Sequence, residues 1–190
     1  MFSVLDQPSF RQRISKLSVK EYHQLGEFNE HGHRTELVRG IVVEKMSKSP
    51  LHSKIASRIY RLILAALPAG YSAWKEEPLT LRDSEPEPDV SVTVGDWDAH
   101  DGTHPHTAAL VAEVAVSSPD GDRAMAELYA EAGVAEYWII LPQECLVEVH
   151  LHPQGSHYRE MRTFSRAEEI VSASVPGLRL ALGDLFAGLP

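Results

Sequence analysis

The chain has 190 residues, 43% of them hydrophobic, and carries 27 Asp and Glu against 18 Lys and Arg, for a formal net charge of −9. That length can fill one hydrophobic core and is short for two, so we expect a single domain over residues 1–190. No apolar run approaches the roughly 20 residues of a membrane span, and residues 1–16 lack the apolar centre of a secretory signal. With Cys145 as the only cysteine, we expect a cytoplasmic protein without membrane contact or internal disulfide.

The first third of the chain predicts small elements followed by one long helix. Residues 1–17 are expected to form an N-terminal extension, and the capping-box pattern from Ser18 to Glu21 predicts a short helix after it. Residues 36–38 and 41–46 read as a hairpin about a Gly-containing turn. Apolar residues then recur at helical spacing over 50–67, which makes this the most regular helix of the sequence.

Two carboxylates in neighbouring predicted strands are the strongest functional signal. Short strands are expected at 71–74 and 79–81, and Asp89 then opens the alternating run 90–94, while Glu113 lies within the apolar strand 110–116. By strand parity both acids lie off the main apolar stripe, and the polar loop that joins the strands favours an antiparallel pair. The acids could therefore converge on a divalent metal ion; a strand-edge position or an arginine partner would explain Glu113 equally well.

The rest of the chain predicts a second helix and more strands. Residues 122–132 have helical spacing and end at Gly133, and strands are expected at 136–141, 146–151 and 157–164 and near Val171. Residues 180–190 are expected to dock on the body of the protein. Together these elements predict an α/β protein, with a mixed β-sheet and two principal flanking helices.

Several of these segments resemble a known family. The motifs are Glu36-Leu-Val-Arg-Gly, Ser49-Pro50-Leu51-His52, Pro88-Asp89-Val90, Val111-Ala-Glu113-Val, Leu128-Tyr-Ala-Glu-Ala-Gly-Val-Ala-Glu-Tyr-Trp138 and Pro176-Gly-Leu-Arg-Leu. Over about residues 18–186 the chain resembles a family of small prokaryotic restriction endonuclease-like proteins within the PD-(D/E)XK nuclease superfamily. The resemblance implies a restriction-endonuclease-like core.

The resemblance also implies a site and a chemistry. Asp89 and Glu113 would bind Mg²⁺ (or Mn²⁺), assisted by the backbone carbonyl of Val114 and by Glu36, and the reaction would be phosphodiester hydrolysis in DNA. Related nucleases suggest a homodimer. The sequence does not distinguish DNA from RNA as the substrate.

The sequence departs from the family at its lysine. The superfamily position two residues after the glutamate is Ala115, and the family position on the following helix is Met125. Lys75 is the best replacement candidate, since Lys54 falls on the polar face of its helix. Arg123 is a poor substitute, because it lies about 200° round the helix from Met125. Two functions therefore stay open: a Mg²⁺-dependent DNA endonuclease with weakened activity, or a catalytically inactive nuclease-like protein that acts as a binding or interaction module.

Histidines offer weaker signals. His52 lies one turn into the long helix, where it could contact a substrate phosphate or be a hydrogen-bonded core histidine. The loop 95–107 gathers several Asp and His residues, but their spacing matches no zinc pattern. We expect a solvated loop there, and a hydrolase that uses these histidines with a different metal is the third alternative.

Overall fold

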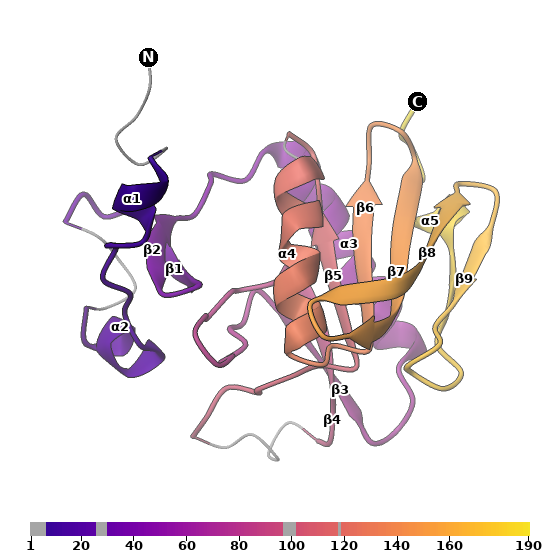
Figure 1. Ribbon diagram of the computed structural model, residues 1–190. Helices are drawn as coiled ribbons and strands as arrows, with labels where there is room; N and C mark the ends of the chain where they lie inside the picture. Colours follow the sequence, from indigo (N-terminus) through magenta and orange to yellow (C-terminus); the bar gives the residue numbers. More distant parts are fainter. Residues whose placement is uncertain (1–6, 26–29, 97–101, 118) are drawn as a thin grey trace. The chain divides into compact units, whose positions relative to one another are not determined.

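The computed structural model describes residues 7–25, 30–96, 102–117 and 119–190 (Figure 1). The chain divides into two compact units. The first, here called the N-terminal unit, comprises Met1–Lys45 and Arg82–Pro86, and the second, here called the sheet unit, comprises Met46–Leu81 and Glu87–Pro190.

The N-terminal unit holds two short helices and a hairpin: α1 (Pro8–Arg11), α2 (Val19–Leu25), β1 (Thr35–Val38) and β2 (Ile41–Glu44). The predicted capping box is present, because Ser18 N–H donates to Glu21 Oε2 at 2.8 Å and Glu21 N–H donates to Ser18 Oγ at 3.2 Å. The hairpin pairs Val38 with Ile41 and turns through positive φ at Gly40, where a side chain would also meet Lys16 Cβ at 2.7 Å.

The sheet unit is built on one six-stranded sheet in the order β3-β4-β5-β6-β7-β8. Every neighbouring pair is antiparallel except β5 and β6, which are parallel and are joined through α4. The predicted mixed sheet is thus confirmed. The elements of the unit are α3 (Pro50–Ala66), β3 (Tyr71–Lys75), β4 (Val90–Val94), β5 (Leu110–Val114), α4 (Pro119–Glu131), β6 (Glu136–Leu141), β7 (Leu146–Gln154), β8 (His157–Ser165), β9 (Glu169–Val171), β10 (Arg179–Ala181) and α5 (Leu182–Leu185).

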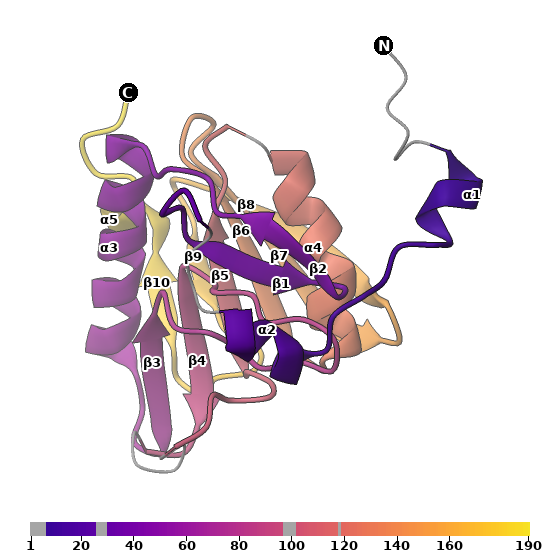
Figure 2. The ribbon, with the colours of Figure 1, turned by 90° about the vertical axis from the view of Figure 1, so that its left-hand side faces the viewer.

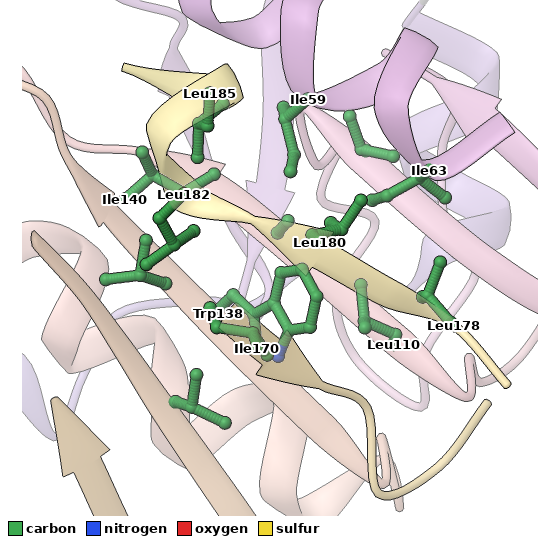
Figure 3. Close-up of a cluster of buried hydrophobic side chains, with 14 of the residues drawn as sticks. Ile59, Ile63, Leu110, Trp138, Ile140, Ile170, Leu178, Leu180, Leu182 and Leu185 are labelled. Carbon is green, nitrogen blue, oxygen red and sulfur yellow. The ribbon is translucent and has the colours of Figure 1, made fainter. Parts of the chain in front are cut away.

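The two long helices cover opposite faces of the sheet (Figures 1 and 2). On one face α3 buries Ile55, Ile59 and Ile63 against alternate residues of the central strands, including Leu110 and Trp138. Figure 3 shows this cluster, with Leu180, Leu182 and Leu185 of the C-terminal segment packed into it. The other face packs against α4 through Val111, Leu128, Tyr129, Tyr137 and Ile139. The parity of the strand residues therefore sets which helix each side chain meets.

Residues 79–81 do not form the predicted strand. Leu79 and Leu81 are buried, as a strand pattern suggests, but Pro78 lacks an N–H and the segment pairs with a loop instead. Thr80 N–H donates to Pro105 O at 2.9 Å, and Thr80 O accepts from His106 at 2.7 Å. The buried alternation therefore reflects packing on the α4 face of the sheet.

Two further differences concern element ends. Helix α4 begins at Pro119, three residues before the predicted start, and β5 ends at Val114 where the prediction continued to residue 116. Within the residues that the structure describes, no helix is long and apolar enough to cross a membrane.

Candidate active site

The structure brings the two predicted carboxylates together where β4 begins. The β4–β5 register pairs Val90 with Ala112, so Asp89 lies opposite Glu113 and both side chains fall on one face. Asp89 N–H donates to Glu113 Oε2 at 3.0 Å, and Val114 N–H donates to Asp89 Oδ2 at 2.9 Å. Backbone hydrogen bonds therefore fix each carboxylate against the neighbouring strand.

Asp89 also accepts from two side chains near the start of α3. Lys48 Nζ lies 2.9 Å from Oδ1, and His52 Nε2 lies 2.9 Å from Oδ2. His52 sits in the first helical turn, where its own N–H donates to the N-cap Ser49 Oγ at 3.2 Å. Burial raises the pKa of Asp89, but His52 and Lys48 outweigh it and hold the pKa below its ordinary value.

Glu76 is a third carboxylate beside this pair. Its Oε1 accepts from Lys75 Nζ at 2.6 Å and lies 3.1 Å from Lys48 Nζ. The backbone of Glu76 has φ of 57°, a left-handed conformation that is rare outside glycine and costs about 1 kcal/mol or more. Burial raises the pKa of Glu76, and the two lysines more than offset this, so the pKa is lowered. Lys48 thus bridges Glu76 and Asp89.

Glu113 differs from Asp89 in its surroundings. Tyr129 of α4, which is fully buried, donates its hydroxyl to Glu113 Oε1 at 2.9 Å. Burial and then the charge of Asp89 raise the pKa of Glu113 well above its ordinary value, despite the hydrogen bonds from Asp89 N–H and Tyr129. Two acids this close repel each other when both are ionised, and a cation between them would relieve that repulsion.

The other predicted site residues lie as follows. Glu36 is half-buried on β1 of the N-terminal unit, and its part in the site stays a prediction. Lys75 contacts Glu76, and within the described residues no contact joins it to Asp89 or Glu113. Val114 contributes its N–H, while the role of its carbonyl stays a prediction.

On α4 the position of the missing lysine is apolar. Met125 packs in the cluster that contains Leu128 and Tyr129. Arg123 points to other partners, since it donates to both oxygens of Glu148, at 3.1 and 2.6 Å, and to Asp120.

Sequence reasoning missed Lys48, Glu76 and Tyr129. Tyr129 had a usable signal, because it lies one turn after Met125 on the face that meets the strand of Glu113. Lys48 and Glu76 lie outside the regular parts of α3 and β3, where no periodicity indicates the direction of a side chain. Only the fold shows that they meet Asp89.

Asp89 and Glu113 offer carboxylate oxygens, the type of ligand that Mg²⁺ takes in proteins. Within the described residues no group of three or more His, Cys, Asp and Glu side chains is placed to hold a metal ion. Mg²⁺ instead uses one or two carboxylates with waters and substrate phosphates. Asp89 Oδ1 and both oxygens of Glu113 each have one hydrogen-bond donor, which leaves a lone pair for a cation.

The histidine loop gives no support to the third alternative. His106 is used to bond Thr80 O at 2.7 Å. Asp98, His100 and Asp101 lie outside the described residues.

Comparison with known proteins agrees with the fold. The model of a protein family named Uma2, described as "Putative restriction endonuclease", matches residues 19–183. A crystal structure described as "a putative nuclease belonging to DUF820 from Anabaena variabilis ATCC 29413" has 20% identity and a TM-score of 0.71, over 90% of this chain and 97% of that one. This likeness shows a shared fold. No curated protein matches the chain.

Proposed function

The chain belongs to the Uma2 family of restriction endonuclease-like proteins, and from that premise we propose that it is a Mg²⁺-dependent endonuclease that hydrolyses phosphodiester bonds in DNA. The observation that carries the proposal is the juxtaposition of Asp89 and Glu113 across β4 and β5, with Lys48 and His52 on Asp89. Acids, a lysine and a histidine at one buried position are the groups that phosphoryl transfer uses.

Each residue has a role that follows from its contacts. Asp89 and Glu113 supply carboxylate oxygens for the cation, and Mg²⁺ bound there would polarise the scissile phosphate and lower the pKa of a bound water. Tyr129 and Asp89 N–H hold Glu113 in one orientation. His52 Nε2 donates to Asp89 Oδ2 and so orients that carboxylate, while its Nδ1 is buried without a hydrogen-bond partner within the described residues.

The rival function is a nuclease-like module that binds a partner without hydrolysis. The apolar packing of Met125 favours it, because the position that would present an amine to Glu113 presents a thioether. The homodimer and the cytoplasmic location expected from the sequence stay predictions.

The deciding experiment combines Mn²⁺ titration with plasmid nicking. Wild type, Asp89→Asn and Glu113→Gln are compared with Asp184→Asn, which changes an exposed acid of α5. We expect Mn²⁺ to raise the Tm of wild type and Asp184→Asn only, and cleavage to fall at least about 100-fold in the two site variants. Cleavage by Asp89→Asn at the wild-type rate would refute the proposal, and Mn²⁺ binding without cleavage would favour the rival. A labelled RNA in parallel tests the choice of DNA.

A further inference from the structure

Lys48 is the lysine whose ammonium touches the candidate metal-binding carboxylates. Its Nζ lies 2.9 Å from Asp89 Oδ1 and 3.1 Å from Glu76 Oε1. Resting on the proposed function, we propose that Lys48 is the catalytic lysine of this protein, orienting the attacking water and offsetting charge on the phosphoryl oxygens. Lys48 precedes the N-cap of α3, an element other than α4, on which the resemblance places the lysine.

The geometry leaves Lys48 able to act on a substrate. An ammonium has three N–H donors, and Asp89 and Glu76 use two of them within the described residues. The side chain is 28% exposed, whereas that of Asp89 is 6% exposed, so the amine lies between the buried acid and solvent. A water or phosphate oxygen at the third donor would therefore be next to the site of Asp89.

The surrounding structure holds the amine in place. Glu76, whose carboxylate contacts Lys48, has a positive φ. Strained backbone of this kind is concentrated at functional sites. The N-cap Ser49 starts α3 directly after Lys48, which fixes the backbone on one side. A flexible surface lysine would need neither constraint.

Arg123 and Lys75, the two other cations considered for this role, have different partners. Arg123 is committed to Glu148 and Asp120. Lys75 bonds Glu76 at 2.6 Å and makes no contact with Asp89 within the described residues. Lys75 is therefore a matched control, since it shares the anchor of Lys48 but not its contact with the active-site acid.

The test uses four full-length proteins: wild type, Lys48→Met, Lys75→Met and the double variant Lys48→Met/Met125→Lys. We expect Lys48→Met to lower single-turnover cleavage of plasmid with Mn²⁺ by about 100-fold. The double variant should regain at least about tenfold of this loss. A lysine at 125 lies one turn before Tyr129, which already reaches Glu113. Lys75→Met should stay within about threefold of wild type.

A second readout does not depend on cleavage. Removing the positive charge beside Asp89 should let Mn²⁺ raise the Tm of Lys48→Met at a concentration at least about threefold lower than in wild type. Lys75→Met should leave that midpoint unchanged. A lysine whose ammonium lies away from the bound cation would lower the Tm without shifting the Mn²⁺ midpoint.

The outcomes separate this inference from the proposed function. Wild-type cleavage by Lys48→Met, or an unshifted Mn²⁺ midpoint in that variant, overturns the role of Lys48 and leaves the nuclease proposal standing. Mn²⁺ binding by wild type without any cleavage also overturns it, since the lysine then does not complete the site. If wild type neither binds Mn²⁺ nor cleaves, the proposed function fails, and the role of Lys48 falls with it.

Discussion

At the scale of single residues, the hydroxyl of Tyr129 is the contact that orients Glu113 from the helix side. Tyr129→Phe removes the bond to Oε1 and leaves a buried carboxylate with one donor. We expect a loss of about 1–2 kcal/mol in the free energy of unfolding and a Mn²⁺ midpoint raised about tenfold. Urea denaturation and Tm measured against Mn²⁺ concentration give the two quantities.

Tyr158→Phe is the matched control for this prediction. Its hydroxyl donates to Val134 O at 2.8 Å, so the variant loses a comparable hydrogen bond at a residue without contact to either carboxylate. We expect it to be destabilised by about 1 kcal/mol with an unchanged Mn²⁺ midpoint. Equal shifts of the midpoint in both variants would show that Tyr129 has no specific effect on Glu113.

His150 makes the stability of the fold depend on pH, independently of the site at Asp89 and Glu113. It packs between Tyr137 and Tyr158, with ring centroids 5.7 and 5.8 Å away. Burial lowers the pKa of His150, only partly opposed by Glu148. His150 therefore binds its proton more tightly in the unfolded chain than in the folded one. The contribution of neutral His150 to the free energy of unfolding is complete above pH about 6.5 and is lost as the pH falls through the lower pKa of the folded state.

The measurement is urea denaturation between pH 7 and pH 5. His150→Gln should lose less stability over this range than wild type, because the buried ionisable ring is gone. His157→Gln, at an exposed position on β8, should keep the wild-type slope. A slope in His150→Gln equal to that of wild type would contradict the assignment.

At the scale of helices and strands, regular periodicity was sufficient for prediction. The alternation of Val90 with Val92 and of Leu110 with Ala112 placed both acids on the face opposite the α3 core, as the register shows. Helix α3 was predicted within one residue, because its apolar stripe and its terminal proline leave little choice. A face or an element end of this kind depends on local sequence alone.

Side chains from irregular segments could not be predicted in the same way. Lys48 lies two residues after the hairpin predicted over 36–46 and just before α3, where no periodicity indicates the direction of a side chain. Its meeting with Asp89, 41 residues later, is a property of the assembled sheet unit. Leu79 and Leu81 show the opposite case. Their alternation predicted a strand, but the two side chains are buried in a segment that forms no strand.

Glu136 connects the start of β6 to the turn before β10 through hydrogen bonds. This fully buried carboxylate accepts from Trp138 Nε1 at 2.7 Å through Oε1, and from Ser172 Oγ, Ser174 Oγ and the N–H groups of Ala173 and Ser174 through Oε2. An acid in the interior is stable only when its oxygens are satisfied in this manner. Glu136 therefore holds these two segments together.

Glu136→Gln should be strongly destabilising. The amide has one acceptor oxygen in place of two, so its NH₂ group must face donors on one side. We expect a loss of about 2–4 kcal/mol in urea denaturation, against less than about 0.5 kcal/mol for Glu144→Gln at an exposed position after β6. Equal stability of the two variants would show that the Glu136 bonds are replaceable.

At the scale of the whole molecule, the negative charge is unevenly distributed. The sheet unit holds 19 Asp and Glu against 10 Lys and Arg, whereas the N-terminal unit holds eight of each. The entire net charge of −9 therefore belongs to the unit that carries the candidate site. Several of its few cations are already paired with acids, among them Arg123 and Lys75. A polyanionic substrate would be repelled there unless bound cations offset the carboxylates.

DNA binding should therefore depend on a divalent cation even when no cleavage occurs. Ca²⁺ prefers oxygen ligands as Mg²⁺ does, and in fluorescence anisotropy at 50 mM NaCl we expect it to tighten binding of a labelled duplex at least about tenfold over EDTA. Asp89→Asn/Glu113→Gln removes two acids, so its binding in EDTA should exceed that of wild type and should not respond to Ca²⁺. Asp184→Asn should retain the wild-type response, because an exposed acid outside the site holds no cation. If wild type binds DNA equally well in EDTA and in Ca²⁺, the DNA is held by a surface remote from Asp89 and Glu113. A cation bound at these carboxylates would then have no effect on the complex.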